Sequence, residues 1–70
     1  MTEREKEVLR YIIQFKQTNG YSPTVREIAN GINTSSIPHV SAMLDDLSTE
    51  GYISFKPKSP RTIRVLKFIS

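Results

Sequence analysis

The chain has 70 residues, a formal net charge of +3 and no cysteine. This length allows one domain, so residues 1–70 are expected to form a single unit. The lack of thiols excludes disulfides and thiolate metal sites. No apolar run resembles the core of a signal peptide or is long enough to cross a bilayer. We therefore expect a soluble, cytoplasmic protein that has no membrane contact.

The first predicted helix spans about residues 3–18. Thr2 and Glu5 form a capping box, in which each side chain satisfies a backbone N–H of the first turn. Apolar residues then recur at three- and four-residue steps: Val8, Tyr11, Ile12 and Phe15. Asn19-Gly20 should end the helix, because glycine adopts the left-handed conformation of a C-terminal cap.

Two shorter helices are predicted next, at about residues 25–31 and 36–50. Thr24 and Glu27 form a second capping box, and Ser35 or Ser36 caps the later helix. The apolar face of the later helix is formed by Val40, Leu44 and Leu47. About four residues join the two helices, and Asn33 among them suits a positive φ. So short a connection is typical of a helix-turn-helix.

A β-hairpin is predicted over about residues 52–66. The run 52–56 favours strand, residues 57–60 contain two prolines and favour a turn, and residues 61–66 alternate between polar and apolar. The predicted fold is therefore mostly α with a small β-hairpin, a three-helix winged helix-turn-helix. The apolar segment at 65–69 is expected to pack against or pair with something.

Positive charge is concentrated in the hairpin. Residues 1–50 contain five lysines and arginines against seven acids, whereas residues 51–70 contain five basic residues and no acid. A one-sided basic segment is typical of a protein that binds a polyanion. Lys56, Lys58 and Arg61 lie around the hairpin tip, where a wing would contact the DNA backbone. A solvated basic tail is the alternative interpretation.

The start of the third helix suits the major groove of duplex DNA, which admits one helix. The residues expected to contact DNA are small or polar: Ser35, Ser36, Pro38, His39, Ser41 and Ala42. The alternative is that they only cover an exposed helix face. Asp45 and Asp46 argue against deep insertion of the second half of this helix, because phosphates repel acids. Tyr52 and Phe55 are expected to pack beneath the hairpin rather than stack on bases.

We find no set of residues for catalysis, for a cofactor or for a small-molecule ligand. His39 is the only histidine, and no partner at suitable spacing would complete a metal site. No nucleophile is paired with a base, and the three glycines do not form a phosphate-binding loop. The chain is therefore not expected to be an enzyme.

Several stretches, in order and at these spacings, resemble the N-terminal DNA-binding domain of the LexA family of SOS-response repressors. They are residues 2–5 with 7–9, residues 19–29, Val40 with Leu44 and Leu47, residues 51–53, and residues 60–61 with 63–66. The resemblance implies that a dimer binds a palindromic DNA operator. It also implies that Ser36, Pro38, His39, Ser41 and Ala42 read bases, while Lys56, Lys58 and Arg61 contact the backbone.

Three departures from the family pattern limit what can be carried over. Asn33 stands where family members usually have glycine, and Thr34 stands where they usually have an apolar residue. The residues at the base-reading positions are not a standard set, so the operator sequence of the family cannot be assigned to this chain. The self-cleaving peptidase and dimerisation domain of the family has no counterpart in the 70 residues, so an excised domain and a small stand-alone protein both stay open. Two other functions also stay open: a winged-helix module that binds protein instead of DNA, and a hairpin that binds structured RNA.

Overall fold

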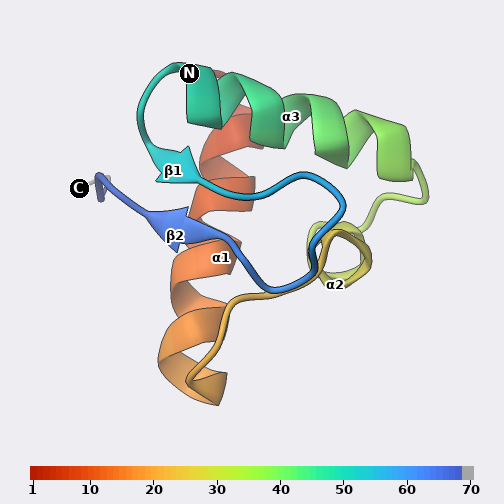
Figure 1. Ribbon diagram of the computed structural model, residues 1–70. Helices are drawn as coiled ribbons and strands as arrows, with labels where there is room; N and C mark the ends of the chain where they lie inside the picture. Colours follow the sequence, from red (N-terminus) through yellow and green to blue (C-terminus); the bar gives the residue numbers. More distant parts are fainter. Residues whose placement is uncertain (69–70) are drawn as a thin grey trace.

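The computed structural model describes residues 1–68 and contains three helices followed by a two-stranded antiparallel sheet (Figure 1). The elements are α1 (Glu3–Asn19), α2 (Val25–Gly31), α3 (Ile37–Thr49), β1 (Ile53–Ser54) and β2 (Arg64–Val65). The predicted fold class, a mostly helical winged helix-turn-helix, is confirmed. No helix within residues 1–68 is both long and apolar enough to cross a membrane.

Both predicted capping boxes are present and begin the first two helices. The Thr2 hydroxyl accepts from the Glu5 N–H at 3.1 Å, and the Glu5 carboxylate accepts from the Thr2 N–H at 2.9 Å. The same pair of bonds joins Thr24 and Glu27 at the start of α2. α1 ends as predicted at Gly20, whose φ of 82° lets its N–H reach the carbonyl of Lys16.

The turn between α2 and α3 covers residues 32–36. Asn33 adopts the predicted positive φ, at 59°. The N–H of Thr34 donates to the carbonyl of Ala29 at 2.9 Å, which ties the turn back to α2. Ser36 is the residue that caps α3, because its hydroxyl accepts from the N–H of His39. This turn fixes the direction in which α3 leaves α2.

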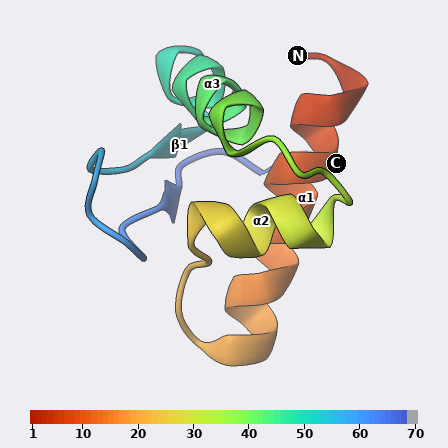
Figure 2. The same ribbon diagram turned by 90° about the vertical axis from the view of Figure 1, so that its right-hand side faces the viewer.

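One cluster of buried side chains holds the three helices and the hairpin together. Its members are Val8, Leu9, Ile12, Ile28, Ala29, Ile32, Val40, Met43, Leu44, Leu47, Ile53 and Ile63. α2 crosses α1 closely at Gly31, where an added Cβ would overlap the ring of Tyr11. Figure 2 shows α2 lying across α1, with α3 seen nearly end-on and the hairpin loop to one side.

The hairpin has far fewer paired residues than the predicted strands at 52–56 and 61–66. Only Ile53 with Val65 and Ser54 with Arg64 are paired. Two prolines in the connecting segment cannot donate to a ladder, and Thr62 binds the Lys56 N–H through its side chain instead of through backbone pairing. The result is a long loop, residues 55–63, which we call the wing loop.

The segment after β2 leaves apolar side chains in contact with solvent. Leu66 is 57% exposed and Phe68 is 70% exposed, whereas Val65 packs partly against the core. Phe68 lines a shallow depression together with Ile13 and Val65. The expected packing of the apolar end is therefore only partial, and Ile69 lies outside the described residues.

Candidate nucleic-acid interface

The outer face of α3 carries small and polar side chains because most of its large apolar residues turn inward. Val40, Met43, Leu44 and Leu47 are buried in the core. The predicted contact residues Ser35, Ser36, Pro38, His39 and Ala42 are exposed, and Ser41 is half-buried. They lie in the turn before α3 and in its first two turns. Apart from His39 these side chains are short, so this part of α3 can approach a base-pair edge closely.

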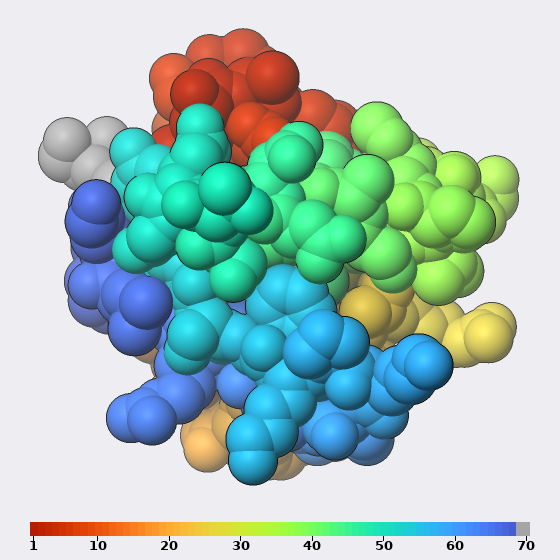
Figure 3. All heavy atoms as spheres, turned by 45° about the horizontal axis from the view of Figure 1, so that its top comes forward, coloured from red at the N-terminus to blue at the C-terminus, as the bar shows by residue number. Residues whose placement is uncertain are grey.

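The wing loop lies beside α3 on one face of the molecule. In Figure 3 the loop, in blue, lies directly below α3, in green and teal. A groove of about 530 Å³ separates the loop from α3 and from the start of α2. Its polar lining comes from all three segments: Arg26, Ser41, Asp45, Lys56, Lys58 and Arg61. Of the predicted contact residues, Ser41 from α3 and Lys56, Lys58 and Arg61 from the wing loop therefore line the same groove.

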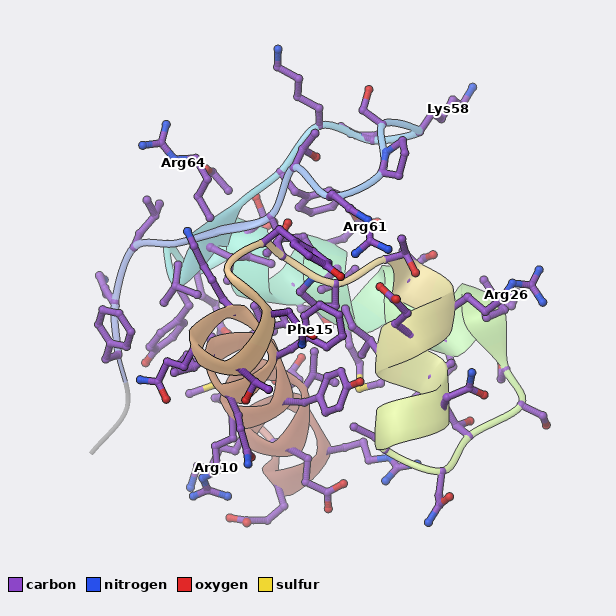
Figure 4. All side chains as sticks on the ribbon, turned by 90° about the horizontal axis from the view of Figure 1, so that it is seen from below. Arg10, Phe15, Arg26, Lys58, Arg61 and Arg64 are labelled. Carbon is purple, nitrogen blue, oxygen red and sulfur yellow. The ribbon has the colours of Figure 1, made fainter. Side chains whose placement is uncertain are left out.

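Lys56 and Lys58 are exposed on the wing loop, as predicted. The Lys56 backbone is held by Thr62, whose hydroxyl accepts from the Lys56 N–H at 2.9 Å and bonds the Ser59 carbonyl at 3.0 Å. Lys58 has a φ of 67° at the tip of the loop, and its side chain points away from the protein (Figure 4). Within residues 1–68 neither ammonium group forms an ion pair. Both charges are therefore available to an external anion.

Arg26 is a further basic residue on this surface that sequence reasoning did not select. It lies in the first turn of α2, is exposed, lines the groove and points outward in Figure 4. The sequence did place Arg26 in the first turn of a short capped helix, next to the inward-facing Val25. Only the packing of α2 against α3 shows that this position faces the wing loop and not the opposite side.

Arg61 lies differently from the other predicted wing residues, because its guanidinium turns back onto the protein. It forms a salt bridge with Glu27 at 3.0 Å and lies over the ring of Tyr21, 4.5 Å from the ring centre. In Figure 4 it points toward the body of the molecule, whereas Lys58 points away. Most of its hydrogen-bonding capacity is therefore used inside the protein.

Two acidic residues in the second half of α3 lie on different sides of the helix. Asp45 is exposed and lines the groove, one turn beyond Ser41. Asp46 lies on the side toward α1, where a hydrogen bond with the Glu5 carboxylate favours its protonated form and raises its pKa. The pKa of Glu5 itself is lowered, mainly because its carboxylate accepts from the Thr2 N–H. The second half of α3 is therefore less favourable to phosphates than the first half.

The described part of the chain contains no cluster of side chains suited to bind a metal ion. No three histidine or acidic side chains within residues 1–68 gather closely enough to hold an ion. The surface is instead built from a helix face, hydroxyl groups and unpaired cations. These are the groups that bind the edges of bases and the oxygens of phosphates.

Known proteins with similar sequences agree with this arrangement. The family model described as the LexA DNA binding domain matches residues 1–62, which contain all three helices, β1 and most of the wing loop. The chain belongs to the LexA DNA-binding domain family. The predicted resemblance to LexA is thereby confirmed.

Individual LexA relatives give the same result. The chain is 35% identical over 66 residues to the LexA repressor of Carboxydothermus hydrogenoformans, and 39% identical over 66 residues to the LexA repressor of Staphylococcus aureus strain USA300. Each alignment covers 94% of this chain and 32% of the relative. The chain thus spans about a third of the length of these curated LexA relatives.

Proposed function

We propose that the chain binds duplex DNA in a sequence-specific manner and is the operator-binding domain of a transcriptional repressor. The observation that carries this proposal is that Ser41, from the small-residue face of α3, and the unpaired cations Lys56 and Lys58 of the wing loop line one groove. The match of residues 1–62 to the family model described as the LexA DNA binding domain supports the proposal.

The proposed roles divide by chemistry. The first two turns of α3 lie in the major groove, where Ser41, Ala42 and His39 meet base edges. Ser35, Ser36 and Pro38 lie at the entry to that groove. Lys56, Lys58 and Arg26 neutralise phosphates on the flanking backbone. A bound α3 would repress by occupying promoter DNA that RNA polymerase needs, so no catalysis is assigned to the chain.

The proposal includes a palindromic operator occupied by two copies. A single small domain offers few contacts, and two half-sites read together multiply affinity. The relatives that are named repressors are bacterial, so the proposed site of action is the cytoplasm, where the chromosome lies.

The first experiment is selection of bound duplexes from a random DNA pool at moderate salt, followed by sequencing. We expect an enriched motif of two inverted half-sites at fixed spacing. A single short motif would indicate recognition by one copy at a time and would contradict the palindrome. Failure to enrich any motif, even at low salt and high protein concentration, would contradict sequence-specific DNA binding.

A second candidate function is a winged-helix module that binds another protein. The acids on α3 and the exposed Leu66 and Phe68 favour it. If it holds, partner binding will be insensitive to neutralisation of Lys56 and Lys58, and no DNA motif will be recovered. A structured RNA that outcompetes duplex DNA would instead point to the RNA-binding alternative.

A further inference from the structure

Arg61 joins the far end of the wing loop to the start of α2. Its Nη1 atom donates to the Ser22 carbonyl oxygen at 3.1 Å and to Glu27 Oε1 at 3.0 Å, while Nη2 donates to Glu27 Oε2 at 3.3 Å. The guanidinium thus binds the Glu27 carboxylate through two parallel hydrogen bonds, which fix the relative orientation of the two groups as well as their separation. Tyr21 closes one face of the guanidinium.

Glu27 is at the same time part of the structure that begins α2. Its Oε1 accepts from the Thr24 N–H at 2.8 Å, which completes the capping box. One carboxylate therefore holds the first turn of α2 and the wing loop together. Tyr21 extends the connection to α1, because its ring packs edge-on against Phe15 at a centroid distance of 5.8 Å.

Besides Arg61, a short sheet at its base and the apolar packing of Phe55 and Ile63 hold the wing loop. The sheet at its base contains two residue pairs, and the loop between them has nine residues. The Thr62 hydroxyl accepts from the Lys56 N–H and donates to the Ser59 carbonyl, so these hydrogen bonds join residues of the loop to one another and not to α2 or α3. Ile63 is buried and anchors the returning chain. The pair of Arg61 and Glu27 is the one salt bridge within residues 1–68 that joins different elements, since the other two lie inside α1.

We propose that Arg61 is a positioning residue for DNA binding, which sets the distance of Lys56 and Lys58 from α3 through Glu27 and is not itself a phosphate contact. The inference rests on the proposed function. As the salt-bridge partner of Arg61, Glu27 is likewise assigned a positioning role. The inference also replaces the prediction, made from charge, position and the resemblance to LexA, that Arg61 contacts the DNA backbone.

The two roles of Arg61 predict opposite effects for a neutral residue at position 27. If Arg61 bound a phosphate, Glu27 would compete for its guanidinium, and Glu27→Gln would strengthen DNA binding. If Arg61 positions the wing loop, Glu27→Gln releases the loop, and the conformation able to bind becomes a smaller fraction of the population. Glutamine keeps an oxygen that accepts from the Thr24 N–H, so the capping box survives the substitution.

The test measures dissociation constants for the complete chain and three variants, Glu27→Gln, Arg61→Gln and the double variant. The probe is the duplex recovered by pool selection, at several salt concentrations and at a temperature where melting curves show each variant folded. We expect each single variant to weaken binding about two- to fivefold, the range that exposed ion pairs contribute. The double variant should bind no more weakly than either single one, and the salt dependence should stay unchanged.

Lys58→Ala is the matched control, because it removes a wing cation that forms no ion pair within residues 1–68. It should shallow the slope of log affinity against log salt by about one. Tighter binding by Glu27→Gln, or a slope that becomes shallower by about one in Arg61→Gln, would overturn the positioning role.

A second measurement follows the wing loop without DNA. Backbone amide relaxation of Lys58 and Ser59 should report faster and larger motion in both single variants than in the parent chain. Unchanged motion in both would overturn the inference even if DNA binding falls. A parent chain that binds no duplex would overturn the proposed function first, whereas tight parent binding with stronger binding by Glu27→Gln would overturn only the role of Arg61.

Discussion

Lys58 and Arg61 lie three residues apart on the wing loop, and both have a backbone φ in the left-handed region, at 67° and 59°. Their charges have different surroundings. Lys58 points to solvent, whereas Arg61 is paired with a carboxylate that belongs to α2. Both residues are basic and belong to the same loop, so only the surrounding side chains distinguish the proposed phosphate contact, Lys58, from the proposed positioning residue, Arg61.

Salt dependence tests the residues that have free cations. Binding that neutralises about four to six phosphates should give a slope of log affinity against log salt near −4 to −5. The double variant Lys56→Ala/Lys58→Ala should shallow the slope by about two, and Arg26→Ala by about one. Lys16→Ala is a suitable control, because Lys16 lies in the last turn of α1 and lines the depression at Phe68 rather than the groove. An unchanged slope in Lys56→Ala/Lys58→Ala would contradict the assignment of the wing.

At the scale of elements, each helix begins at a hydroxyl that accepts a backbone N–H, at Thr2, Thr24 and Ser36. These starts were predictable because capping depends on residues only three apart. The strands were predicted too long, since alternation in sequence does not reveal that prolines and Thr62 interrupt the ladder. Local pattern therefore located the helices better than the strands, whose pairing depends on residues about ten positions apart.

Ser36 allows the cap of α3 to be separated from DNA contact. Ser36→Ala should lower the free energy of unfolding by about 1 kcal/mol, because the His39 N–H loses its acceptor. Ser36→Asp restores an acceptor and should keep the stability of the parent, but it should weaken DNA binding because it puts a negative charge beside phosphates. Urea denaturation and a binding titration measure the two effects. Equal DNA affinity for Ser36→Asp and the parent would show that this end of α3 does not approach the backbone.

The two capping boxes predict how stability changes with pH. Hydrogen bonds from Thr24 and Arg61 lower the pKa of Glu27, and the Thr2 N–H lowers that of Glu5, from an ordinary value of 4.5. A lowered pKa in the folded state stabilises the protein above the unfolded pKa and ceases to do so as pH falls through the folded pKa. Asp46 has a raised pKa, so its protonation on acidification works in the opposite direction.

We therefore expect the melting temperature to decrease as pH falls below about 4.5, where Glu5 and Glu27 lose their contributions, and the protonation of Asp46 to offset part of that decrease. In Asp46→Asn the decrease should become steeper, and in Glu27→Gln it should become shallower. Thermal melts of the three proteins over this range measure both effects. A Glu27→Gln profile that matches the parent below pH about 4.5 would contradict the contribution assigned to Glu27.

At the scale of the whole molecule, a single core holds the three helices and the base of the hairpin together. That core leaves α3 and the wing loop on one face, and it leaves Leu66 and Phe68 exposed after β2. The proposed DNA-binding face is small, so one copy has room for contacts to one half-site. Strong binding to an operator is therefore expected to need two copies.

Covalent linkage of two copies tests this expectation. Half-sites of helix-turn-helix proteins lie one helical turn or a multiple of it apart, about 34 Å at the minimum. A Gly/Ser linker of about 40 residues has a mean end-to-end distance near 35 Å and can span that separation. The linked chain should bind an inverted repeat about 10²- to 10⁴-fold more tightly than the single chain, and a lone half-site about equally. Equal affinity for the repeat and the half-site would contradict binding by two copies.

The sequence by itself determined the helices, their caps, the turn at Asn33 and the inward faces of α1 and α3. Each of these depends on residues close together in the chain, where spacing and backbone preference act directly. It also indicated the family, because the motifs keep their order and spacing. The basic character of the hairpin was likewise evident from the sequence, since counting charges needs no geometry.

Only the tertiary structure decided which cations face outward and which are used within the protein. Arg61 meets Glu27 across 34 positions of sequence, and Arg26 reaches the groove because α2 packs against α3. The same packing directs Asp45 toward the groove and Asp46 toward Glu5. Which side chains become partners depends on the crossing of α2 with α3 and on where the wing loop packs against them. These arrangements depend on burial summed over the whole core, so no local pattern encodes them.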